Sequence, residues 1–214
     1  LEGVGGEGYV EEVIRQFMRR AFRRPVRKEE VAKIVGFYDS IAPDSETFEE
    51  AVRETLALVL ISPEFLYLAE PVEAGGKMQS LTDHELATRL SYFLWSSMPD
   101  QELFALAENK QLSKPDVLEK QIRRMTEDQR SWQFVRNFTS QWLDLSGLNR
   151  IAVNPQYYKG FNERLKSQMA EETIQFVGRV LYHDLSALSF LKSDFVMINQ
   201  SLAKHYGLPD PGSS

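Results

Sequence analysis

Apolar residues recur at helical spacing along nearly the whole chain of 214 residues. In the first such stretch, Val13, Phe17 and Ala21 stand four residues apart, which places them on one face of an α-helix. The period-two alternation that is typical of a half-buried strand is nearly absent, and only Asp194–Ile198 is a passable strand candidate. The sequence therefore predicts an all-α fold, a bundle-like array of about ten helices with at most one short strand segment.

The most apolar stretch is LSYFLWSSMPD, residues 90–100, in which four large side chains follow one another. Upstream, Thr82 and Glu85 have the spacing of a capping box, which predicts a helix start. Downstream, Met98 precedes a proline, and a residue in that position avoids helical dihedral angles. We therefore expect the end of a core helix here, with Trp95 at least about 80% buried.

A flexible link divides the chain. Glu73-Ala74-Gly75-Gly76-Lys77 predicts a boundary between an N-terminal helical domain, 1–72, and a larger C-terminal helical domain, 78–214. The first part offers few helices, so we expect the two parts to pack together through apolar helix faces. The Gly-rich start, LEGVGGEG, and the close, PDPGSS, are expected to be edges of a longer polypeptide.

Composition excludes several classes of function. The chain has no cysteine, which excludes disulfides, thiolate metal sites, a cysteine nucleophile and covalent haem attachment within it. The formal charge of −6 argues against nucleic acid as a partner. No apolar run is long enough for a membrane span. No phosphate-binding, dinucleotide-binding or nucleophile-elbow motif appears, so no cofactor is predicted.

Histidines and acids give no catalytic pattern. His84, His183 and His205 lie in separate predicted elements, His84 as an exposed first-turn residue and the other two near helix C-termini. The pairs Glu49-Glu50 and Glu171-Glu172 are adjacent, so their side chains point in different directions from a helix. We therefore predict no catalytic and no metal-binding residue, and whether the protein is an enzyme stays open.

A basic run stands out in this acidic chain. It places seven cations within fourteen residues, namely Arg15, Arg19, Arg20, Arg23, Arg24, Arg27 and Lys28. One interpretation is internal salt bridging to Glu-rich helices. The other is a docking patch of Arg19, Arg20, Arg23 and Arg24 for another domain of the parent polypeptide or for an anionic ligand such as an acidic glycan. Docking requires at least two exposed guanidinium groups without a carboxylate partner.

Aromatic residues also allow two interpretations. The residues concerned are Tyr92, Trp95, Trp132, Trp142, Tyr157 and Tyr158. Core packing is expected to account for most of them, and the alternative is a cleft in which rings stack on sugars.

Two parts of the chain resemble known domains. FMRRAFRRP at 17–25, FEEAV at 48–52 and SPEFLY at 62–67 resemble a planctomycete-type domain of unknown function. LTD at 81–83 and the long aromatic motif at 90–100 resemble the start of a second such domain, which usually follows the first. The resemblance implies a large exported protein, located outside the cytoplasm, in which these domains stand beside cytochrome-c-like domains. It implies no established activity and hence no catalytic residues.

Three functions are compatible with these observations. The first is a non-catalytic helical interaction or scaffold module of a larger exported, redox-associated protein, with the other domains of that polypeptide as partners. The second is a hydrolase acting on polysaccharide, whose acids and histidine come from distant helices. The third is a helical domain that binds a small molecule or noncovalent haem in an interior cavity.

Overall fold

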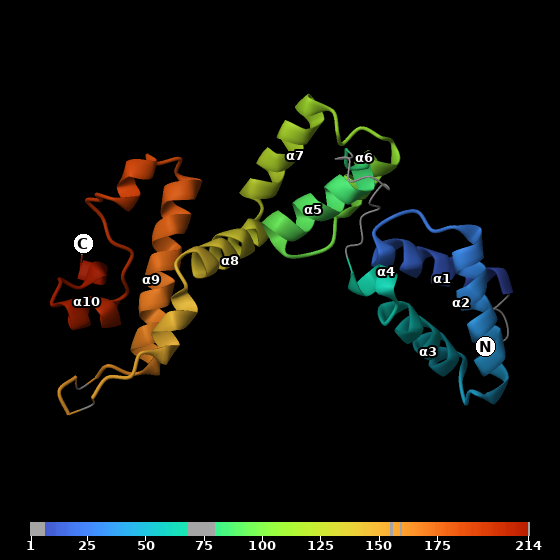
Figure 1. The fold of residues 1–214 in the computed structure, drawn as a ribbon, viewed down its shortest axis with the longest axis horizontal. Coiled ribbons are helices and arrows are strands. Elements are labelled where there is room, and N and C mark those ends of the chain that lie inside the picture. The colour runs from blue at the N-terminus through green and yellow to red at the C-terminus, as the bar shows by residue number, and fades with distance from the viewer. Residues whose placement is uncertain (1–6, 68–79, 155, 159, 214) are drawn as a thin grey trace, which may run out of the picture. The chain divides into compact units, whose positions relative to one another are not determined.

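The fold is known from a computed structural model, which describes residues 7–67, 80–154, 156–158 and 160–213. Its α-helices are α1 (Glu7–Phe22), α2 (Lys28–Ile41), α3 (Phe48–Leu60), α4 (Pro63–Leu66), α5 (Asp83–Trp95), α6 (Gln101–Glu108), α7 (Pro115–Glu127), α8 (Trp132–Trp142), α9 (Glu163–Tyr182) and α10 (Gln200–Tyr206) (Figure 1). Short 3₁₀ helices join several of them, and these ranges contain no strand. The predicted all-α class is confirmed. No helix in these ranges is both long and apolar enough to cross a membrane.

The chain forms two compact units. The first runs to Tyr92 and includes Ser97–Gln121, while the second consists of Phe93–Ser96 and Ile122–Ser214. This division passes through α5 and α7. The predicted link at 73–77 lies outside the described residues, so the two domains 1–72 and 78–214 stay a prediction.

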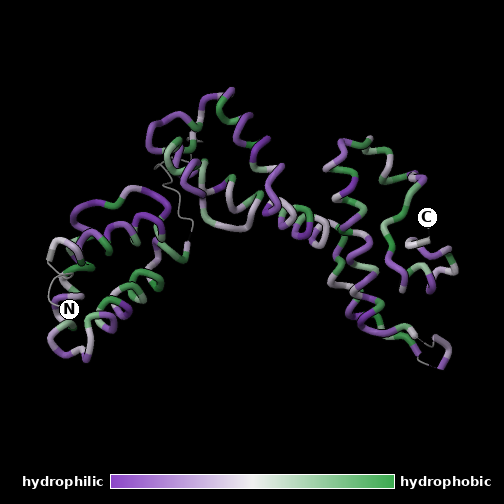
Figure 2. Tube along the Cα trace, turned by 180° about the vertical axis from the view of Figure 1, so that it is seen from behind, coloured by the Kyte–Doolittle hydropathy of each residue, from purple (hydrophilic) through white to green (hydrophobic). Residues whose placement is uncertain are grey.

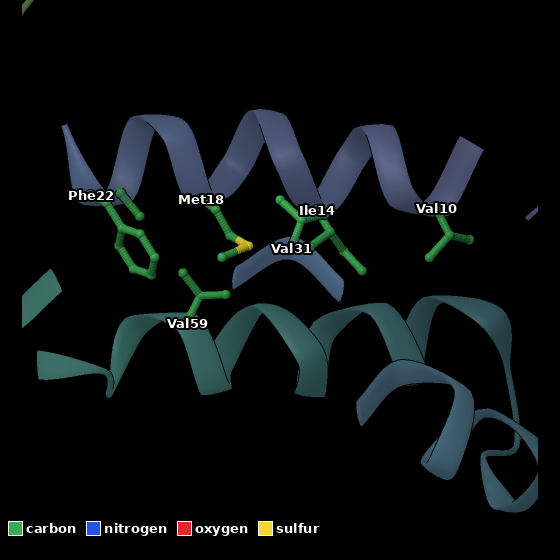
Figure 3. Close-up of a cluster of buried hydrophobic side chains, with 7 residues drawn as sticks. Val10, Ile14, Met18, Phe22, Val31 and Val59 are labelled. Carbon is green, nitrogen blue, oxygen red and sulfur yellow. The ribbon is translucent and has the colours of Figure 1, made fainter. Parts of the chain in front are cut away.

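The core of the first unit lies between α1, α2 and α3. Val10, Ile14 and Met18 follow one another at four-residue spacing on α1 and are all buried. Figure 3 shows these side chains directed towards Val31 of α2 and Val59 of α3. Hydrophobic positions recur along these helices with hydrophilic ones between them (Figure 2), as expected for amphipathic helices that share one core.

Helix α5 begins and ends on local signals. The Thr82 N–H donates to Oε2 of Glu85 over 2.7 Å, and the Glu85 N–H donates to Oγ1 of Thr82 over 3.3 Å, so the predicted capping box is confirmed. The helix ends at Trp95, because Ser96 has a left-handed backbone with φ of 52°. The end therefore comes before the predicted break at Met98-Pro99.

The Trp95 side chain contacts the C-terminal end of α7. Its side chain is buried, with 2% exposed, which confirms the expected burial. The indole Nε1 donates a hydrogen bond of 3.0 Å to the carbonyl of Met125, a group near the helix C-terminus. The guanidinium carbon of Arg130 lies 3.5 Å from the ring centroid, a cation–π contact.

The second unit is organised around the pairing of α8 with α9. Val135 of α8 packs with Ile174 and Val177 of α9 in a buried cluster. Gly178 lies directly under the Trp132 ring, and a Cβ atom at that position would overlap the ring. The close approach of the two helices therefore depends on glycine.

The strand candidate Asp194–Ile198 does not form a strand, in agreement with the prediction of at most one short strand segment. The described residues offer no second strand to pair with it. Its Phe195 instead stacks on Phe176 of α9, with ring centroids 5.0 Å apart. Side-chain packing on a helix accounts for the apolar composition that suggested a strand.

Candidate functional site

Four arginines of the basic run form ion pairs inside the first unit, the first being Arg15 with Glu11 of the same helix. Arg19 pairs with Glu108 of α6. Arg24 donates to both carboxylate oxygens of Glu30, at 3.1 and 2.8 Å, and Arg27 adds a bond of 3.0 Å to the same group. Hydrogen bonds from Arg24, then from Arg27, hold the pKa of Glu30 well below its ordinary value. These residues act as structural cations in the described part of the chain.

Arg23 is buried and has a different set of partners. It directly follows α1 with a left-handed backbone, φ of 58°, and its side chain reaches the end of α4. Its Nη2 atom donates to the carbonyl oxygens of Glu64 and Phe65 over 3.1 and 3.2 Å. The guanidinium carbon also lies 5.8 Å from the centroid of the Tyr92 ring. Arg23 thus satisfies carbonyls that the short helix α4 leaves without intrahelical partners.

Among the four arginines of the predicted docking patch, only Arg20 has an exposed guanidinium group without a carboxylate partner in the described ranges, whereas docking requires at least two. Its side chain is exposed and forms no hydrogen bond or ion pair with any described residue. Because Arg19 and Arg24 are paired and Arg23 is buried, the four arginines do not present a single exposed cationic patch. Docking by this run stays a prediction, and within the described residues it concerns one guanidinium group.

The three histidines lie at separate places. His183 caps the C-terminus of α9, and His205 lies in the last turn of α10, as predicted. His84 is half-buried instead of exposed, and burial lowers its pKa below the ordinary value. It borders a cavity of about 390 Å³ together with Glu85, but that carboxylate already accepts two bonds from Thr82. No set of three metal-ligating side chains occurs among the residues described.

The adjacent acids Glu171 and Glu172 are held by partners. Glu171 accepts hydrogen bonds from Arg136 at 2.9 and 3.2 Å. Glu172 accepts a bond of 2.8 Å from the hydroxyl of Tyr206. Burial, and then this hydrogen bond, raises the pKa of Tyr206 to about 12. Both carboxylates therefore have structural roles within the second unit.

A row of four neighbouring aromatic rings runs from α5 along one side of α8. We call Phe93, Phe134, Phe138 and Trp142 the aromatic row. Its ring centroids are 4.9, 5.5 and 5.5 Å apart in that order; the first pair is tilted and the last two pairs are stacked. Phe93 is 63% exposed, Phe138 44% and Trp142 54%, while Phe134 is half-buried. Core packing is the expectation for Trp142, but the buried residues of α8 are Val135 and Thr139.

The prediction of core packing is wrong for most of the six aromatic residues considered in the sequence analysis. Trp95 is buried, but Tyr92, Trp142, Tyr157 and Tyr158 are exposed. Within the aromatic row, Phe138 stacks on both Phe134 and Trp142, at interplanar angles of 23° and 29°. Stacking on sugars needs a free ring face, so these contacts do not favour the sugar-stacking alternative.

Comparisons with known proteins give two family matches. Residues 81–208 match the family model described as PSD4, protein of unknown function (DUF1592). Residues 9–70 match the model described as PSD5, protein of unknown function (DUF1595). No curated protein and no solved structure matches the chain. The resemblance to paired domains of unknown function is confirmed, while the cytochrome-c-like neighbours stay a prediction.

Proposed function

Since the chain belongs to the PSD4 family of proteins of unknown function through more than half of its length, we propose that it works as a non-catalytic interaction module. In this proposal, the aromatic row of the second unit docks against another domain of the parent polypeptide. The parent is a larger exported, redox-associated protein in which the module lies outside the cytoplasm.

The exposure of the aromatic row is the observation that supports docking. Large contiguous apolar surfaces are uncommon on monomers and often mark interaction sites. Aromatic residues are enriched at interfaces, where they bury much area with few side-chain torsions to fix. Stacking within the row, at interplanar angles of 23° and 29° for its last two pairs, fixes the rings before a partner arrives. The conformational entropy that these rings lose when a partner binds is therefore small.

A single-cysteine experiment tests the proposal. The chain contains no cysteine, so Phe138→Cys introduces one thiol into the row. The rate of its alkylation is measured by mass spectrometry in the isolated chain and in the longest polypeptide that the gene encodes. Coverage of the row is expected to slow alkylation at position 138 by about tenfold or more in the longer polypeptide.

Gln133→Cys is the matched control. Gln133 is exposed on the same helix, five residues before Phe138 and hence about 140° around the helix axis. Its alkylation rate is expected to be the same in both polypeptides. Equal rates at position 138 in the two polypeptides would show that the row is not covered there, and the docking proposal would be wrong.

A further inference from the structure

The first unit contains an apolar cleft. Its volume is about 470 Å³, within the range of small-molecule sites. Helices α1 and α3 supply most of its walls, with Phe17, Leu56 and Leu60 among the lining side chains. Tyr92 and Met98 complete the lining from α5 and the segment after it. Leu60 and Tyr92 are partly open to solvent, which leaves an entrance for a ligand.

The charge on the cleft is of one sign. Two arginines, Arg20 and Arg23, line it, and no acidic residue stands among its described lining residues. Arg23 donates to carbonyl oxygens of α4, and its charge has no carboxylate partner within the described ranges. Arg20 is exposed and free of any such partner. In a chain of net charge −6, this local excess of positive charge beside apolar walls is unusual.

We propose that this cleft binds a small amphipathic anion, an aliphatic or aromatic carboxylate whose apolar body lies between α1 and α3 and whose carboxylate pairs with Arg20. The apolar walls supply burial for the hydrocarbon part. The planar guanidinium of Arg20 donates two parallel hydrogen bonds to the two carboxylate oxygens. Arg20 can do so at little cost, because no partner among the described residues must first be released. This proposal does not rest on the docking proposal above.

Three probes with alkyl chains of nearly equal length separate the apolar and the charged contributions. Octanoate, 1-octanol and octyltrimethylammonium are titrated separately into the chain, and binding is followed by the backbone amide shifts of Phe17, Leu60 and Arg20. Octanoate is expected to shift these amides and to bind about tenfold more tightly than 1-octanol. The cationic probe is expected to bind most weakly.

Variants then assign the effect to the cleft. Arg20→Gln is expected to weaken octanoate binding by about tenfold and to leave 1-octanol binding unchanged. Leu60→Gln is expected to weaken both probes, because it removes apolar wall area. Arg53→Gln, which changes an exposed arginine of α3 outside the cleft, is expected to alter neither. Since the Arg20 side chain loses no partner among the described residues, its variant is expected to melt within about 2 °C of the parent.

Several results would overturn the proposal. One is equal affinity for octanoate and 1-octanol, and another is octanoate binding that Arg20→Gln leaves unchanged. Absence of any amide shift around the cleft at millimolar octanoate would also reject it. None of these outcomes affects the docking proposal, which rests on alkylation rates at position 138.

Discussion

Replacement of Arg23 tests how the first unit is held together. The side chain is 6% exposed and joins the end of α1 to the end of α4 through two well-formed hydrogen bonds from a charged donor. Each such bond contributes about 1.5–3 kcal/mol. Part of this is offset, because burying the guanidinium costs solvation. Arg23→Ala is therefore expected to lower the free energy of unfolding by about 3 kcal/mol.

The backbone at this position separates Arg23→Ala from Arg23→Gly. With φ of 58°, any residue that has a Cβ atom is disfavoured relative to glycine by about 1 kcal/mol. Arg23→Gly should therefore cost only about 2 kcal/mol, although glycine normally destabilises more than alanine. Arg23→Lys keeps the charge but not the planar fork, and should lie between the parent and the alanine variant.

Urea unfolding followed by circular dichroism, together with melting temperature, measures these differences. About 3 kcal/mol corresponds to a fall of about 6–12 °C for a chain of this size. An alanine variant as stable as the parent would mean that the α4 carbonyls find other donors. An alanine variant more stable than the glycine variant would refute the backbone part of the reasoning.

Four further predictions concern stability. Trp95→Ala should cost about 3–5 kcal/mol as a large-to-small core change, and Trp95→Phe about 1 kcal/mol for the lost indole hydrogen bond, both measured by urea unfolding. Gly178→Ala should destabilise by about 1–3 kcal/mol despite the better helix propensity of alanine, because its methyl group would overlap the tryptophan that begins α8; a higher melting temperature would contradict this. Arg24→Glu should cost about 2 kcal/mol and Arg20→Glu less than about 0.5 kcal/mol, since only Arg24 has an ion-pair partner; similar melting temperatures would contradict the assignment. The pKa of Glu30 is lowered in the folded protein, so its ionised carboxylate contributes fully to the free energy of unfolding above its unfolded pKa of about 4.3, and this contribution is lost as pH falls below that value. The difference in free energy of unfolding between the parent and Glu30→Gln, measured by urea titration, should therefore shrink between pH 6 and about pH 3.

Local signals in the sequence mark several element ends, as the capping box of Thr82 and Glu85 shows for α5. Asp100 and Asn162 accept hydrogen bonds from the first turns of α6 and α9, and Gly207 ends α10 with φ of 69°. Each of these ends depends on a few residues that are neighbours in the sequence, so such ends are predictable.

Features that depend on distant residues were not predictable in the same way. The four arginines of the predicted docking patch look alike in sequence, yet Glu108 and Glu30 pair with two of them and a third is buried against α4. The cleft beside Arg20 forms because α1, α3 and α5 lie close together, and residue spacing within a single helix does not predict such an approach. Likewise, helical period places Phe138 and Val135 on similar faces, and only the position of α9 decides which one is buried.

The core between α1, α2 and α3 can close only after all three helices have been synthesised. Met18 and its neighbours on α1 gain cover from Val31 of α2 early, but Val59 is added about 50 residues after the start of α1. At about 5–20 residues per second, those residues take roughly 3–10 seconds to appear. Once Val59 has left the ribosome, closure is fast, because the three helices are consecutive in the chain. During those seconds the hydrophobic stripe of α1 is not yet covered by α3. Chaperones would bind the nascent chain in this interval.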